Sequence, residues 1–187
     1  RAVTLDQVRW WEVLGTLRWG IICILQASGH LSGASRSVEL AAIGRRVCET
    51  ELDLLLLIDP DGATPAPTEA GRGYDEGSHG APTAPQLVEA VREFLERDVM
   101  AATTGRVQFH ARVAVNVLAM VERELASGAA MAEAHRARLA TLGYDGDAAL
   151  ADAIRTGAET RLPEVTAAVR ASVQDKLVVA NPTYGDA

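Results

Sequence analysis

The sequence has few aromatic residues and almost no cysteine. Only 4% of its 187 residues are aromatic, and Cys23 and Cys48 are the sole cysteines. Low aromatic content combined with abundant alanine favours helices over a β-sandwich, so we predict an all-α fold. Both cysteines lie in apolar runs without metal-ligand spacing, which predicts free buried thiols in a reducing, cytoplasmic compartment. A disulfide across a helical hairpin is the alternative.

Long apolar runs are also missing. The run from Trp19 to Leu25 is seven residues long, whereas a helix needs about 20 residues to cross a bilayer. The chain also lacks the charged start, apolar core and cleavage site of a secretory signal. These absences predict no membrane span. Because the sequence begins with Arg1 rather than Met, one open hypothesis is that Arg1 is internal to a longer product.

Positive charge is in deficit. The sequence carries 18 lysine and arginine residues against 25 aspartate and glutamate residues, which gives a net charge of -7. A surface that binds nucleic acid or an anionic membrane broadly needs the opposite sign. We therefore expect no nucleic-acid partner, although local basic patches are compatible with this composition.

The sequence starts with an unusually apolar helix. Thr4 and Gln7 fit a capping box, which predicts a helix over about 5–27. Beyond Trp19 this helix is apolar nearly all round, and such a helix is buried on several sides. We therefore expect a large body to pack against it.

A second helix follows a short break at 28–33. It is predicted over about 37–57, with a serine cap at its start and Asp59-Pro60 as its stop. The two predicted helices are joined by a short connection, so we expect an antiparallel hairpin.

The segment 59–83 has the composition of a linker. It contains five glycines, four prolines and five acidic residues among its 25 positions. An unstructured stretch of this length is unusual inside a compact domain and predicts a boundary. We therefore divide the chain into a hairpin at 1–58, a Gly/Pro-rich linker at 59–83 and a bundle at 84–187.

The bundle segment has no convincing strand alternation and predicts about five helices. Thr83, Pro85 and Gln86 indicate the start of the first one. Glycines, among them Gly128 and Gly157, punctuate the segment and predict breaks between helices. The expected helices run up to a break near 103–105 and then over about 106–126, 131–142, 147–156 and 163–180.

The first block resembles a known family. Residues at about 5–58 are similar to the C-terminal helices of bacterial aminoglycoside-phosphotransferase-like proteins, which are kinase-like enzymes that use ATP on small molecules. The residues that carry the resemblance are Trp11-Glu12-Val13-Leu14-Gly15, Arg18-Trp19, His30-Leu31-Ser32-Gly33, Ser37-Val38-Glu39-Leu40 and Ile43-Gly44-Arg45-Arg46. The resemblance implies a packing element of a kinase-like lobe, because these residues form no chemical motif.

The second block, at about 83–184, resembles an uncharacterised bacterial helical domain found with such phosphotransferases. The runs that carry this resemblance are Leu87 to Leu95, Phe109-His110-Ala111-Arg112-Val113, Asp175-Lys176-Leu177 and Asn181-Pro182. This family has no assigned activity, so the resemblance implies no mechanism.

The catalytic motifs of the kinase-like family are missing from this sequence. That family depends on an H-G-D-x-x-x-x-N loop and on a second, metal-holding Asp. His79-Gly80 is followed by Ala81, and Ile58-Asp59 lies downstream of the matching helices rather than upstream. We therefore assign no catalytic residue and no cofactor to this chain. ATP and magnesium are expected only if an upstream kinase-like region exists, and whether the chain is an enzyme stays open.

The helix predicted from 106 contains the candidate ligand-binding residues. His110 falls within its apolar arc, while Arg112, Asn116 and Arg123 share a separate polar stripe. A partly buried, hydrogen-bonded histidine and a solvated or internally paired stripe are the favoured interpretation. The alternative is a site for an anionic ligand or for the carboxylates of a partner.

Two further groups of charged and histidine side chains have structural interpretations. Glu133 and His135 are two residues apart and so do not share a helix face, which argues against a metal site. Asp175 and Lys176 are predicted to be surface ions.

The leading hypothesis is a C-terminal, non-catalytic portion of a phosphotransferase-like protein, with a helical accessory module for assembly or regulation. The expected partner is an upstream kinase-like lobe or a second copy in a homo-oligomer. The alternatives are a stand-alone helical interaction protein and a bundle that binds a small molecule.

Overall fold

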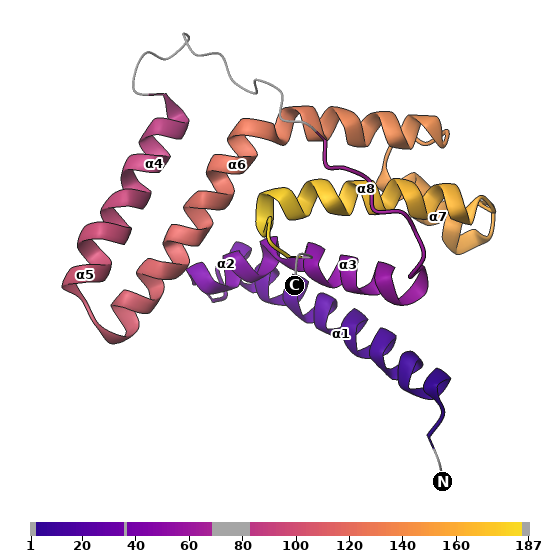
Figure 1. The fold of residues 1–187 in the computed structure, drawn as a ribbon, viewed down its shortest axis with the longest axis horizontal. Helices are drawn as coiled ribbons and strands as arrows, with labels where there is room; N and C mark the ends of the chain where they lie inside the picture. The colour runs from indigo at the N-terminus through magenta and orange to yellow at the C-terminus, as the bar shows by residue number, and fades with distance from the viewer. Residues whose placement is uncertain (1–2, 36, 69–82, 185–187) are drawn as a thin grey trace.

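The computed structural model describes residues 3–35, 37–68 and 83–184. Over these ranges the regular elements are all helices, which confirms the all-α prediction. In Figure 1, α3 and α8 lie at the centre, α1 packs against α2 and α3, and α4 runs beside part of α6. The elements are α1 (Leu5–Leu31), α2 (Val38–Arg45), α3 (Val47–Ile58), α4 (Ala84–Phe94), the π-helix η1 (Leu95–Val99), α5 (Met100–Ala102), α6 (Gly105–Thr141), α7 (Asp147–Thr156) and α8 (Leu162–Ala180).

The capping box at the start of α1 is present as predicted. The Thr4 hydroxyl accepts a hydrogen bond from the Gln7 N–H at 3.3 Å, and the Gln7 side chain accepts one from the Thr4 N–H at 3.1 Å. These bonds satisfy two backbone N–H groups near the helix end. The helix continues to Leu31, a turn beyond the predicted end.

α1 runs antiparallel to α2 and α3, as the hairpin prediction required. The Arg9 side chain donates to the Leu57 carbonyl at 3.1 Å. Farther along, glycines allow close contact: a Cβ at Gly20 would lie 2.8 Å from Thr50 Oγ1. Gly44 likewise lies against Ala27 near the other end of α1. Small residues at these points let the helix backbones approach closely.

The second predicted helix is divided in two. A single helix over 37–57 is wrong, because the backbone turns at Arg46 (φ -92°, ψ 8°) between α2 and α3. The turn is held by hydrogen bonds from the Arg46 side chain to Glu49 at 2.7 and 2.9 Å.

The predicted break near Gly128 is absent, and α6 is continuous over 37 residues. Figure 1 shows that α6 changes direction partway along its length. Ser127 and Gly128 form the kind of pair at which helices kink, and the Ser127 hydroxyl donates to the Arg123 carbonyl at 2.8 Å. One glycine costs a helix only about 1 kcal/mol, so burial of the neighbouring Met131 favours continuity over a break.

The main core joins helices from both sides of the predicted linker. Side chains from α3 pack against side chains from α8 in one buried cluster. Its members are Cys48, Leu52, Leu55, Val173, Leu177 and Ala180. A second cluster joins α6, α7 and α8 through Leu139, Leu142, Leu150 and Val165. The predicted domain boundaries therefore stay predictions, while α3 and the bundle share a core.

The first part of the predicted linker is tied to α8. The backbone N–H and hydroxyl of Thr68 donate to the two carboxylate oxygens of Asp175 at 2.7 and 2.8 Å. Arg170, whose side chain is 1% exposed, donates to the Asp59 carbonyl at 2.6 Å and to its carboxylate at 3.0 Å. The rest of the predicted linker, residues 69–82, lies outside the described ranges.

Among the described residues, no helix has the length and apolar character of a membrane span.

Candidate functional site

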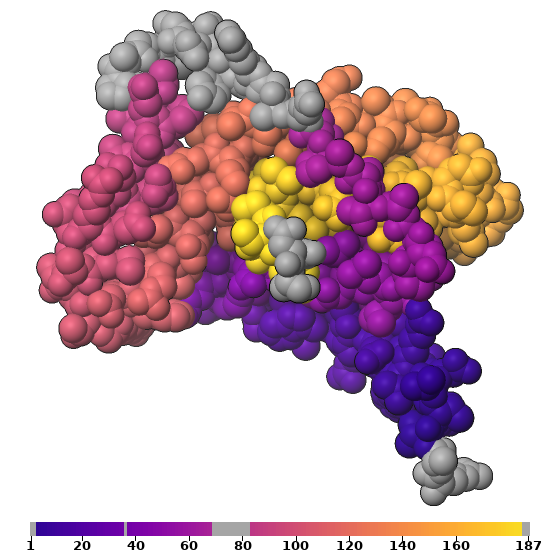
Figure 2. All heavy atoms as spheres, viewed as in Figure 1, coloured from indigo at the N-terminus to yellow at the C-terminus, as the bar shows by residue number. Residues whose placement is uncertain are grey.

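The most conspicuous surface is the uncovered apolar face of α1. Figure 2 shows the indigo N-terminal part of this helix projecting from the body of the molecule. Trp11 and Leu25 are each 64% exposed. The α1 face, as we call it, consists of Val8, Trp10, Trp11, Leu17, Trp19, Ile21, Ile22, Ile24 and Leu25. Large exposed apolar patches of this kind mark interaction sites.

The α1 face also lacks charge. From Trp19 to Ser28 the helix has no acidic or basic residue. On its inner side only Gly20 and Cys23 are buried, because α2 and α3 cover one side of the helix and leave the others open. The sequence predicts a larger body over this helix, and the helices of the described residues leave most of it uncovered.

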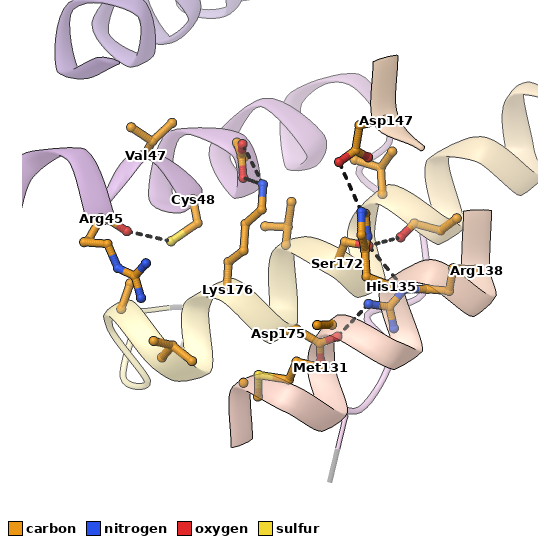
Figure 3. A pocket seen from close by; sticks show the side chains of 18 of the residues that line it. Arg45, Val47, Cys48, Met131, His135, Arg138, Asp147, Ser172, Asp175 and Lys176 are labelled. Carbon is orange, nitrogen blue, oxygen red and sulfur yellow. Dashed lines mark hydrogen bonds and ion pairs between the residues drawn. The ribbon is translucent and has the colours of Figure 1, made fainter. Parts of the chain in front are cut away.

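A groove of about 680 Å³ lies between α3, α6, α7 and α8. Figure 3 shows side chains from these helices turned toward it. Its apolar lining includes Val47 and Cys48 from α3, Met131 and Leu139 from α6, Leu150 from α7, and Val169 and Val173 from α8. A volume of this size is typical of small-molecule sites, which are mostly apolar with a few polar groups.

A polar network lies along one wall of the groove. His135 Nδ1 is 2.9 Å from the Ser172 hydroxyl, and His135 Nε2 is 3.1 Å from the Asp147 carboxylate (Figure 3). Arg138 donates to the same hydroxyl at 3.2 Å and to Asp175 at 2.6 Å. The network therefore links α6 to α7 and to α8.

The contacts from Ser172 to His135 and from His135 to Asp147 are those of a hydrolase triad. The surroundings of Ser172, however, indicate a structural role. The Ser172 hydroxyl also donates to the Ala168 carbonyl of its own helix at 3.0 Å. Ser172 lies in the interior of α8, where neighbouring backbone N–H groups are used by the helix. The backbone of α8 therefore supplies no free N–H donors for an oxyanion hole beside Ser172, and we assign these residues to helix cross-linking.

Three ion pairs line the groove. Lys176 and Glu51 are 2.8 Å apart, and Arg138 and Asp175 are 2.6 Å apart. Arg45 and Glu124 form the third pair. Asp175 is 5% exposed, so its assignment as a surface ion is wrong: the buried carboxylate holds both Thr68 and Arg138. Lys176 is exposed, as predicted.

The predicted site residues do not come together in this groove. Asn116 and Arg123 line a second hollow of about 530 Å³ between α2, α6 and the end of α8. Arg123 donates to the Val179 carbonyl at 2.7 Å, and burial lowers the pKa of its guanidinium. Arg112 is exposed and lines neither hollow.

His110 is half-buried and lies apart from the other predicted residues. Its Nε2 accepts a hydrogen bond from Arg106 at 3.2 Å, and its ring packs edge-on against Phe109. Its buried Nδ1 has no partner among the described residues. The structure therefore brings together Asn116 and Arg123 of the predicted set, and it leaves His110 and Arg112 elsewhere.

His135, Arg138, Ser172 and Asp175 form a cluster that the sequence does not predict. The helix neighbours of His135 give no sign of it, because its partner Ser172 lies 37 positions away on another helix. No local spacing signals such a contact. Among the described residues, no group of His, Cys, Asp and Glu side chains is arranged to hold a metal ion.

A family model matches the C-terminal part of the chain. A domain of unknown function (DUF6285) matches residues 101–184, which hold α6, α7 and α8. No curated protein and no solved structure matches the chain. The matched segment thus supplies three of the helices that line the groove, while α1, α2 and α3 lie outside it.

Both cysteines are free and buried, as predicted. Burial, with nearby Glu51 and Glu49, raises the pKa of the Cys48 thiol to about 11. At pH 8 its thiolate fraction is then on the order of 0.1%, about a hundredfold below that of an ordinary cysteine. We predict that iodoacetamide alkylates native Cys48 at least about a hundredfold more slowly than the urea-unfolded chain, measured by peptide mapping with mass spectrometry. Equal rates in both states would contradict the burial.

Proposed function

We propose that this chain is a C-terminal, non-catalytic portion of a phosphotransferase-like protein that serves as a helical accessory module for assembly. The observation that carries the proposal is the α1 face, which presents tryptophan, isoleucine and leucine side chains to solvent. Permanent interfaces are apolar and rich in such residues. The α1 face therefore has the composition of a permanent interface whose second partner is not among the described residues.

The proposed occupant of the α1 face is a kinase-like lobe. The support is the resemblance of residues at about 5–58 to helices that close such lobes, because those residues include Trp11 and Trp19 of the face. The missing catalytic loop fits a division of labour in which the lobe supplies ATP and magnesium chemistry. In this proposal α2, α3 and the bundle hold α1 in place.

A homo-oligomer is the second candidate, favoured by one specific observation. α4 exposes Leu87, Val91 and Phe94, which follow one another at helical spacing along its outer side. Each is more than half exposed. A second copy packing through this stripe would form a bundle around a two-fold axis.

Two glutamate variants separate these candidates. Ile24→Glu places a charge on the α1 face, and Val91→Glu places one on the α4 stripe; both positions are about equally exposed, at 55% and 52%. The binding partner is a recombinant kinase-like lobe with an H-G-D-x-x-x-x-N loop, taken from the reading frame that encodes this chain. We expect Ile24→Glu to weaken binding of the lobe at least about tenfold in calorimetry, because a desolvated charge costs several kcal/mol.

The matched variant Val91→Glu is expected to bind the lobe normally. Light scattering measures the molar mass and so tests the homo-oligomer. A wild-type dimer that Val91→Glu converts to a monomer would support the homo-oligomer instead of the kinase-like lobe. A reading frame that encodes no H-G-D-x-x-x-x-N loop overturns the phosphotransferase part of the proposal.

A further inference from the structure

We propose that the groove between α3, α6, α7 and α8 binds an uncharged, largely apolar small molecule that carries a carbonyl or hydroxyl oxygen. This site is separate from the α1 face, since no α1 residue lines the groove. The inference therefore does not rest on the identity of the protein partner.

The groove's charges disfavour a charged ligand. Six of the charged side chains that line it form three ion pairs: Arg45 with Glu124, Lys176 with Glu51, and Arg138 with Asp175. The Asp147 carboxylate instead contacts the His135 ring at 3.1 Å and stands at the exposed rim. A ligand with a net charge must either break one of these pairs or enter without a counter-ion. Both routes cost free energy that a neutral ligand does not lose.

The apolar lining supplies the affinity. Val47, Leu139, Leu150, Val169 and Val173 line the open hollow. Burying apolar surface of a ligand contributes about 25 cal/mol for each Å². A body of two fused rings, or of comparable size, fits a volume of about 680 Å³.

Two cations at the groove retain hydrogen-bond donors for an oxygen atom. The Lys176 ammonium carries three N–H donors, and its contacts are the two oxygens of Glu51 at 2.8 and 3.0 Å. The Arg138 guanidinium carries five N–H donors, and its contacts are Ser172 and Asp175. In contrast, the carboxylates of Asp175 and Glu51 are already engaged. Unused N–H donors beside an apolar lining favour a ligand whose oxygen atom accepts a hydrogen bond.

The probes for this site are 1-naphthol, 1-naphthoate and 1-naphthylmethylammonium, which share one ring system and differ in charge. Thermal unfolding and saturation-transfer NMR measure their binding to the full chain. We expect 1-naphthol to raise the melting temperature and to bind at least about tenfold more tightly than either ion. Equal affinities among the three probes, or no binding of 1-naphthol at millimolar concentration, overturn the proposal.

A pair of phenylalanine variants locates the binding. Ala132→Phe fills the groove from its exposed rim on α6, and Ala137→Phe adds the same ring at an exposed α6 position that does not line the groove. We expect Ala132→Phe to lose the naphthol-induced shift and Ala137→Phe to keep it. Retention of the shift in Ala132→Phe places the naphthol elsewhere, as on the α1 face, and overturns the groove site while leaving the assembly proposal intact.

Discussion

Replacing Arg170 with alanine is expected to lower the free energy of unfolding by about 2–4 kcal/mol. The side chain is 1% exposed and binds the Asp59 carbonyl and carboxylate just beyond the end of α3. Its loss leaves a cavity between α8 and α3, and it removes the hydrogen-bond donor from the Asp59 carbonyl just beyond the end of α3. Urea denaturation followed by circular dichroism measures the change.

The control for this variant is Arg155→Ala. Arg155 pairs with Asp152 at 3.2 Å, but both side chains are about 70% exposed, at 70% and 69%. Exposed pairs contribute about 0–1 kcal/mol, so the control is expected to unfold almost like the wild type. If Arg170→Ala also stays within about 1 kcal/mol of the wild type, Arg170 does not fasten α3 to α8.

Leu52→Ala is expected to destabilise the whole chain by about 2–5 kcal/mol. Leu52 is 5% exposed and belongs to the core cluster shared with Val173 and Leu177 of α8. Because α3 and α8 share this cluster, the loss is expected to appear as one shifted transition that helices on both sides of 59–83 undergo together. Hydrogen exchange of α3 and α8 amides during unfolding checks the shared transition.

Leu56→Ala is the matched control on the same helix. Leu56 is 46% exposed and lies outside the cluster, so its truncation is expected to cost less than about 1 kcal/mol. Separate transitions for α3 and α8 in the Leu52→Ala protein would contradict a shared core and favour an independent hairpin.

Local features of this fold were predictable because their causes lie within a few residues. The capping box at Thr4 and Gln7 fixed the start of α1, and Thr83 with Gln86 did the same for α4. Gly157, with φ 73°, ends α7 where a glycine was predicted to break the chain. Each signal acts through a hydrogen bond or a dihedral angle inside one turn.

The predictions that were wrong concern features that depend on contacts between distant parts of the sequence. Gly128 was expected to end a helix, yet burial on both sides of it outweighs its low helix propensity. Asp175 was expected at the surface, because its partner Thr68 lies 107 positions earlier in the chain. The turn at Arg46 likewise has no breaker residue, and hydrogen bonds from the Arg46 side chain to Glu49 hold it.

The candidate site was predictable only in part. The apolar α1 helix was visible in the sequence, and so was its need for a covering body. The groove was not, since it exists only where α3 meets α6 and α8. His135 and Ser172 show no pattern in the sequence, because two helices bring them together from 37 positions apart.

The tryptophans offer the most direct test of the assembly role. All three, Trp10, Trp11 and Trp19, lie on the exposed face of α1, so any signal from tryptophan in this chain reports on that face. The measurement is ¹⁹F NMR of the chain labelled with 5-fluorotryptophan, in H₂O and D₂O, before and after addition of the unlabelled kinase-like lobe. We predict that the three signals show a solvent-isotope shift in the free chain and lose most of it in the complex. Signals that keep the full shift in the complex would contradict the assembly role of α1.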